Sequence, residues 1–202
     1  SMDLTRYIKE HFTQAVSLLQ SVQEKLIPNI LLASEMMTHA FINDGKVLSC
    51  GNGGSAADAQ HFSAELVGRF ERERIGLPAI ALTTDNCTLT AIANDYGYDL
   101  VFSKQISAIG KKNDVLFAIS TSGNSPNIVQ AINAAHEKKM KIVAMTGKDG
   151  GKVAEQLTAE DVLLNVAYTR TARIQEIHGL MIHIICDLID KCLFGEKQDL
   201  SV

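Results

Sequence analysis

The first forty residues have apolar positions at helical spacing and no pattern typical of strands. Apolar side chains recur every three or four residues, at Ile8, Phe12, Val16, Leu19 and Val22. Pro28 interrupts this run, and a second helical pattern extends from Ile30 to Phe41. Because proline is poorly tolerated inside a helix, the pattern predicts two helices in an N-terminal arm over residues 3–43. Such an arm either covers a sheet face or packs against another subunit, and the pattern favours neither.

From residue 46 onward, short apolar runs alternate with helical patterns. The strand candidates are Lys46–Cys50, Ala79–Leu82, Val115–Ile119, Ile142–Met145 and Val162–Val166. Helical patterns lie between them, including Ala56–Arg69, Pro126–Lys138 and Lys152–Leu157, and a long helix at about Ala172–Leu193 closes the chain. Apolar strands separated by helices predict an α/β fold, a doubly wound five-stranded parallel sheet. We expect one domain over residues 1–202, with the α/β core over 44–197.

Three loops after predicted strands are rich in small residues: GNGGS at 51–55, STSGNS at 120–125 and TGKDGG at 146–151. In doubly wound folds, ligands bind outside the carboxyl ends of the strands. These loops are therefore the places where we expect the site.

The loop STSGNS predicts a phosphate site. Four hydroxyls, at Ser120, Thr121, Ser122 and Ser125, precede a helix that opens with Pro126, and a helix N-terminus favours anions. The loop lacks the lysine of nucleotide-triphosphatase loops. Helix capping by Ser125 is the simpler alternative, but capping accounts for only one of the four hydroxyls.

The loop GNGGS has two interpretations. Gly51 to Ala56 matches the loose dinucleotide pattern GxGxx[GA], and Asp85, near the end of the second strand, is placed to contact a ribose. A single match of this kind is weak, and a second phosphate-type loop is superfluous for one pyrophosphate. We therefore favour a phosphosugar over a nicotinamide cofactor.

Four polar residues on two predicted helices form a candidate catalytic or metal group. His61 and Glu65 are four residues apart and share a helix face, and Gln175 and His183 lie on one ridge of the last helix with Gly179 between them. A carboxylate and a histidine suit proton transfer to and from a sugar, or metal binding. The alternatives are a helix-surface pair for His61 and Glu65, and core histidines for His183 and for His178, to which we assign no role.

Composition restricts the remaining possibilities. The chain has 202 residues, a net charge of −4 and 5% aromatic residues, so we expect no direct nucleic-acid partner. The four cysteines form no CxxC pair, which argues against a thiolate zinc site. We see no signal-peptide pattern and no apolar run of about 20 residues. We therefore expect a cytoplasmic protein with free thiols and no membrane partner.

Taken together, the segments GKVLSCGNGGSAADAQHFSAEL, AIANDYGYD, AISTSGNS and RIQEIHGLMIH resemble the phosphoheptose isomerases of the sugar-isomerase (SIS) superfamily. The resemblance covers nearly the whole chain. It implies a flavodoxin-like SIS fold that converts sedoheptulose 7-phosphate to D-glycero-D-manno-heptose 7-phosphate for lipopolysaccharide heptose synthesis. It also implies a homotetramer with active sites at subunit interfaces.

The resemblance assigns roles by motif position. Glu65 and His183 are the expected acid–base pair, and zinc is the expected metal, with His61, Glu65, Gln175 and His183 as ligands. The expected substrate contacts are Asn52, Gly53, Gly54, Glu65, Asn94, Asp95, Ser120, Thr121, Ser122, Ser125 and Gln175.

A second group on the same fold offers an alternative function. The segments FERERIGLPAIALTTDNCTLTAIAND and CDLIDKCLFG resemble a non-catalytic partner of the replication initiator DnaA. That group lacks the Glu and the second His of the acid–base pair, and both stand here as Glu65 and His183. Because function depends on the site more than on the fold, we favour the enzyme.

Overall fold

The computed structural model describes residues 1–196, so the predicted core boundary at residue 197 lies outside the described residues. Five strands form one parallel sheet in the order β2-β1-β3-β4-β5. Their bounds are β1 Val47–Cys50, β2 Ala79–Ala81, β3 Val115–Ser120, β4 Lys141–Gly147 and β5 Val162–Val166. This order is the flavodoxin-like one, so the predicted fold class is confirmed.

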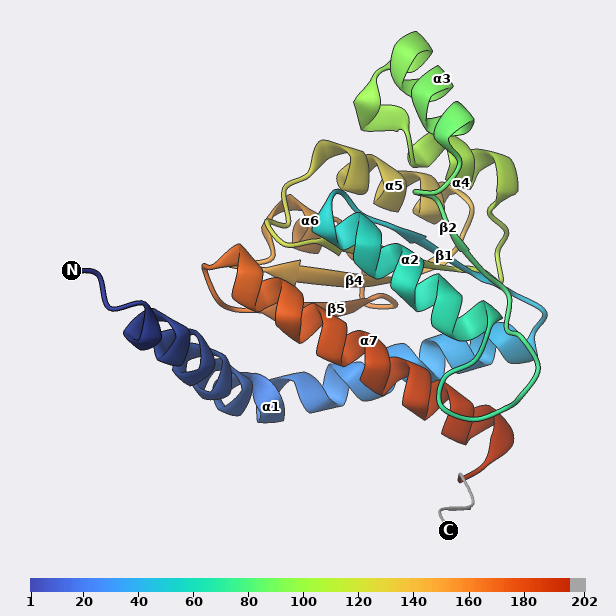
Figure 1. The fold of residues 1–202 in the computed structure, drawn as a ribbon. Helices are drawn as coiled ribbons and strands as arrows, with labels where there is room; N and C mark the ends of the chain where they lie inside the picture. The colour runs from blue at the N-terminus through green and yellow to red at the C-terminus, as the bar shows by residue number, and fades with distance from the viewer. Residues whose placement is uncertain (197–202) are drawn as a thin grey trace.

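Helices cover both faces of the sheet (Figure 1). On one face, alternate strand residues pack against α1 (Leu4–Ile42), α2 (Gly54–Val67) and α7 (Thr171–Phe194). On the other face, the remaining strand residues pack against α4 (Ser103–Ile109), α5 (Pro126–Glu137) and α6 (Gly151–Gln156). Successive strand side chains point to opposite faces. Both faces are buried, which explains why the strands read as continuous apolar runs.

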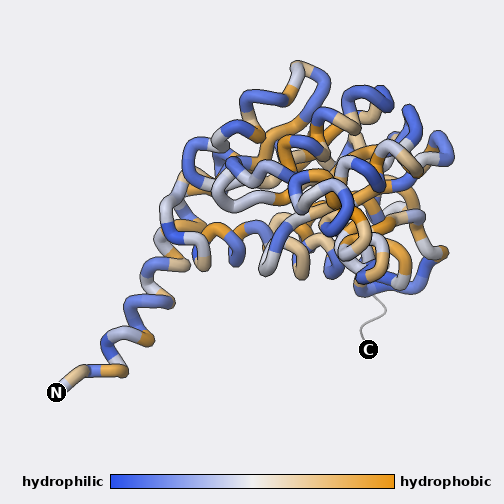
Figure 2. Tube along the Cα trace, turned by 90° about the horizontal axis from the view of Figure 1, so that it is seen from above, coloured by the Kyte–Doolittle hydropathy of each residue, from blue (hydrophilic) through white to orange (hydrophobic). Residues whose placement is uncertain are grey.

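The N-terminal arm is one helix, and the prediction of two helices was wrong. α1 continues through Pro28 and changes direction along its length (Figures 1 and 2). Proline removes one backbone hydrogen bond and kinks a helix without always ending it. Packing holds the second half in place, because Leu26 and Ile30 are buried against the sheet core and Asn29 donates to the Leu163 carbonyl at 2.9 Å.

The first turns of α1 extend away from the rest of the chain (Figure 2). Their apolar side chains face solvent, with Ile8 58% and Phe12 71% exposed, whereas Leu18 is buried. The beginning of the arm therefore has no core to cover within this chain.

Two further elements lie between β2 and α4. Helix α3 (Asn86–Tyr96) and a 3-10 turn, η1 (Tyr98–Leu100), follow β2, and α3 has no buried residue. It stands above the body of the domain in Figure 1. Among the described helices, none is long and apolar enough to cross a bilayer.

Candidate functional site

Two of the three small-residue loops leave the sheet side by side. Cys50, the last residue of β1, is paired with Ala118 of β3, so the loops at 51–55 and 120–125 emerge at the same edge. The strand order reverses between β1 and β3, because β2 lies on one side of this pair and β4 on the other. This switch point is where doubly wound folds bind ligands.

A pair of amides joins the loop after β1 to the first turn of α5, the helix that follows the loop at 120–125. Asn52 donates to the Asn127 side-chain oxygen at 2.9 Å and accepts from its amide nitrogen at 2.8 Å. The Tyr98 hydroxyl donates to the same Asn52 oxygen at 3.0 Å. Asn127 is buried, so it orients Asn52. Sequence analysis missed Asn127 and Tyr98, because only the fold places them opposite Asn52.

The three serine hydroxyls of STSGNS gather within the loop. The Ser120 hydroxyl lies 3.1 Å from that of Ser125 and 3.4 Å from that of Ser122. Ser120 is buried, whereas Thr121, Ser122 and Ser125 are partly exposed. Ser125 occupies the N-cap position of α5, but its side chain makes no capping hydrogen bond. The capping alternative therefore does not account for its hydroxyl.

The loop TGKDGG at 146–151 packs against the loop STSGNS at 120–125 and supports it. Gly123 has φ of +69°, and a Cβ atom there would lie 2.2 Å from the Gly150 carbonyl oxygen. The Gly123 carbonyl in turn accepts from the Val153 N–H at 2.8 Å. TGKDGG thus packs backbone against backbone beneath the loop at 120–125, where no side chain fits.

His61, Glu65 and His183 come together from two helices. The Nε2 atoms of His61 and His183 are 3.2 Å apart, and they lie 3.6 and 3.7 Å from Glu65 Oε2. These residues are partly exposed. α2 carries the first two residues at one-turn spacing, and α7 lies alongside α2 and presents the third. The simpler readings, a lone surface pair and a core histidine, fail for these three residues.

Tetrahedral zinc bound at about 2.0–2.2 Å places its ligand atoms about 3.3–3.6 Å apart. The three separations, 3.2, 3.6 and 3.7 Å, lie in this range or just outside it. Two imidazole nitrogens and one carboxylate oxygen are also ordinary zinc ligands. The residues present therefore fit a zinc ion.

Gln175 lies farther toward the start of α2. A Cβ atom on Gly54 would be 2.6 Å from the Gln175 amide nitrogen, so the absence of a side chain at position 54 makes room for this amide. Among the described residues, no hydrogen bond joins Gln175 to His61, Glu65 or His183. Its place in the ligand set stays a prediction, as do the substrate roles of Gly53 and Gly54 beside it.

Asn94 and Asp95 lie on exposed α3. The Asn94 amide donates to the Asp95 carboxylate at 3.0 Å, and both side chains are exposed. Asp85, considered above for a ribose, instead caps α3 by accepting from the Thr88 N–H at 3.0 Å, and this bond lowers its pKa. The substrate contacts of Asn94 and Asp95 stay predictions.

Two residues missed by sequence analysis border the His–Glu–His group. The Phe70 ring stacks on the His183 ring, with centroids 5.6 Å apart. Burial raises the pKa of Asp58, opposed by the charge of His61 one turn away, and its Oδ2 has no partner among the described residues. Neither residue has a motif that would have identified it.

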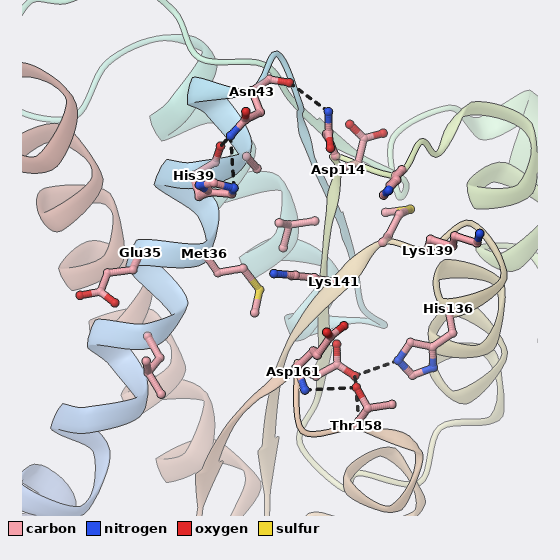
Figure 3. Close-up of a pocket in the computed structure, with 17 residues that line it drawn as sticks. Glu35, Met36, His39, Asn43, Asp114, His136, Lys139, Lys141, Thr158 and Asp161 are labelled. Atoms are coloured by element: carbon pink, nitrogen blue, oxygen red, sulfur yellow. Dashed lines mark hydrogen bonds and ion pairs between the residues drawn. The ribbon is translucent and has the colours of Figure 1, made fainter.

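A cavity of about 980 Å³ lies at the opposite edge of the sheet, where β3 and β4 begin beside the end of α1 (Figure 3). Its buried carboxylates already have partners. Asp161 pairs with His136 at 2.8 Å and accepts from the Thr158 N–H at 2.9 Å. Asp114 accepts from the Lys46 N–H at 3.0 Å. These bonds fix the starts of strands, so we place the candidate site at the carboxyl edge.

Comparison with known proteins identifies the family of this chain. Residues 10–147 match the SIS domain family. The chain is 55% identical to the phosphoheptose isomerase of Neisseria meningitidis serogroup C over 190 residues, 94% of this chain and 96% of the relative. It is 56% identical to that of Chromohalobacter salexigens over 197 residues, 98% and 100% of the two chains.

Solved structures give the same result. The phosphoheptose isomerase GmhA from Neisseria gonorrhoeae superposes with a TM-score of 0.90 at 52% identity, covering 94% of this chain and all of that one. The phosphoheptose isomerase from Francisella tularensis superposes with a TM-score of 0.91 at 42% identity, with the same coverage. The chain therefore belongs to the phosphoheptose isomerase family of SIS-domain proteins.

Proposed function

We propose that this protein is an aldose–ketose isomerase that converts sedoheptulose 7-phosphate to D-glycero-D-manno-heptose 7-phosphate, a step toward lipopolysaccharide heptose. One observation carries the proposal: Glu65 and His183 meet at 3.7 Å, on helices that flank a hydroxyl-rich loop at the switch point of the sheet. The names of the relatives supply the substrate. The relatives described above offer no counterpart to the DnaA-binding alternative.

The sugar phosphate binds at the loop after β3. Thr121, Ser122 and Ser125 donate hydroxyl hydrogen bonds to the phosphate, and Ser120 holds the loop from below. The N-terminus of α5 adds backbone N–H groups and the positive end of its dipole. The sugar then extends toward Asn52, Gly53 and Gly54 after β1, with Gln175, Asn94 and Asp95 as further contacts.

Glu65 and His183 divide the proton transfers between carbon and oxygen. The Glu65 carboxylate removes a proton from C1 of the ketose and returns it to C2, by way of an enediol. His183 donates a proton to the oxygen on C2 and accepts one from the oxygen on C1, so the net change is the aldose. Phe70, stacked on the imidazole, holds the ring in its orientation.

His61, Glu65 and His183 would hold a zinc ion, with Gln175 as the fourth ligand. When bound, zinc would supply positive charge against the negative charge that develops on substrate oxygens. A carboxylate bound to a metal is a weaker base, so zinc is assigned an auxiliary or structural role and no proton transfer is routed through it.

The active protein is a homotetramer with its sites at subunit interfaces. The exposed apolar residues at the start of α1 support this assembly, as does α3, which carries Asn94 and Asp95 and has no buried residue in the single chain.

The test compares wild type with Glu65→Gln in turnover of sedoheptulose 7-phosphate, with zinc supplied. Glutamine keeps the size of the side chain but is not a base, so we expect turnover to fall by about 10²-fold or more. Binding of the sugar phosphate, measured by calorimetry, falls far less than turnover, because the loop at 120–125 that holds the phosphate is unchanged. Wild-type protein that is folded and binds zinc but has no turnover would contradict the proposal.

A further inference from the structure

The loop between α2 and β2, residues 68–78, reaches α7 with three alternate side chains. Phe70 stacks on His183. Arg72 donates to the carbonyls of Phe194 and Gly195 at the end of α7, at 3.1 and 2.6 Å. Arg74 pairs with Asp190 of α7. In Figure 1 this loop runs around the C-terminal part of α7.

The Arg74 guanidinium binds both helices of the candidate site. Its Nε donates to Asp190 Oδ1 at 3.0 Å, and only 2% and 3% of the two side chains are exposed. Its other two nitrogens donate to the carbonyls of Glu65 at 2.8 Å, Leu66 at 3.0 Å and Gly68 at 2.9 Å. These carbonyls lie at the end of α2, where backbone acceptors lack helical partners and a cation is favoured.

The two ends of this link lie close to the proton-transfer residues. On α2, Arg74 holds the backbone carbonyl of Glu65 itself. On α7, Asp190 follows His183 by seven residues, which is two turns along the same helix face. One buried side chain therefore connects the backbone of Glu65 to the face of α7 that presents His183.

We infer that Arg74, through Asp190, is a positioning residue that sets the separation of Glu65 and His183, and this inference rests on the proposed function. Arg74 does not touch substrate. Its five N–H groups in a rigid plane can hold three carbonyls and a carboxylate at once, which a lysine cannot do. Displacements of about 1 Å, from changes remote from the chemistry, reduce turnover by up to about 10²-fold.

A purely structural role is the alternative, and it requires a variant that separates folding from positioning. Removing Arg74 alone leaves Asp190 buried and unpaired, because its other oxygen has no partner among the described residues. Replacing both members of a buried ion pair with apolar residues is often neutral for stability. The double variant Arg74→Met with Asp190→Leu is therefore expected to fold while losing the link between α2 and α7.

The experiment measures kcat, KM and the affinity for zinc ion alone in this double variant, in Arg74→Lys and in Arg72→Met. Arg72→Met is the matched control, because Arg72 lies in the same loop and binds α7 but not α2. We expect the double variant to lose about tenfold or more in kcat and about 10- to 100-fold in zinc affinity. KM stays within about threefold, because the loop at 120–125 is untouched.

The outcomes separate the two roles. Arg74→Lys, which keeps a charge opposite Asp190, is expected to fall between wild type and the double variant, and Arg72→Met to stay within about threefold of wild type. A folded double variant with wild-type kcat and zinc affinity would overturn the inference, as would equal losses in Arg72→Met. Zinc affinity is measured without substrate, so it tests Arg74 even if the wild type proves inactive on the heptulose.

Discussion

At the residue scale, His178 is fully buried, and within residues 1–196 only one of its ring nitrogens has a partner. Nε2 lies 2.8 Å from the Thr146 carbonyl oxygen, so Nε2 carries the proton and Nδ1 is unprotonated. Burial lowers the pKa of His178 from 6.5 to about 4, although the bond to Thr146 opposes this shift. His178 is a neutral core residue, which confirms the core interpretation for this histidine.

This burial makes stability depend on pH. Between pH 6.5 and about 4, the unfolded chain binds a proton at His178 that the folded chain does not. The free energy of unfolding therefore falls as pH falls, by about 2 kcal/mol at pH 5 relative to neutral pH. Urea titrations at pH 7.5 and pH 5 measure the loss. His178→Gln keeps an N–H donor without titrating, and an equal loss in this variant would exclude His178 as the cause.

Local spacing predicts which residues share a helix face, but not which helices meet. The four-residue step from His61 to Glu65 is visible in the sequence, and so is the polar ridge that carries His183. The 3.2 Å approach of His61 to His183 joins positions 122 residues apart, and it depends on how α2 and α7 pack. The contacts of Arg74 could not be predicted from the sequence either, because its partners are backbone carbonyls and one distant aspartate.

At the scale of elements, the predicted bounds of every strand lie within two residues of the observed ones, and the bounds of β5 agree at both ends. Buried parallel strands read as short apolar runs, and their length of four to eight residues distinguishes them from helices. α3 was not predicted, because it buries no residue fully and its apolar positions, Leu89, Ile92 and Ala93, pack only partly against the core. Pro28 gave a false signal of a helix end. Proline does disfavour a helix interior, but the packing of α1 against α7 and β5 keeps the helix continuous.

The beginning of α1 gives a prediction about assembly. Ile8 and Phe12 lie one turn apart and are 58% and 71% exposed, so they contribute little to the fold of the single chain. The double variant Ile8→Ser with Phe12→Ser is expected to keep its helical content, and light scattering at micromolar concentration is expected to show that the proposed tetramer has dissociated. Lys9→Ser, on a polar position of the same turn, is the control. A tetramer that persists in the double variant would exclude Ile8 and Phe12 as part of the interface.

At the scale of the whole molecule, the chain crosses the sheet so that α2 and α7, distant in sequence, lie together on one face. A zinc site formed in this way exists only in the folded chain. Zinc at 100 times its dissociation constant should therefore raise the free energy of unfolding by about 2.7 kcal/mol.

Thermal and urea unfolding, with and without zinc, check this effect, and a strong chelator should reverse it. His183→Ala should abolish the zinc-dependent gain, whereas Thr121→Ala, in the loop at 120–125, should retain it. A gain that persists in His183→Ala would place the metal elsewhere.

The packing of Gly123 on Gly150 has a consequence for protein engineering. Because these two backbones touch where no side chain fits, the conformation of the segment 120–125 depends on that of the segment 147–151. A designer who wants this scaffold to accept a different anion would have to graft both segments together from one donor protein. Exchanging the serine-rich segment alone would set a foreign backbone on a support shaped for another.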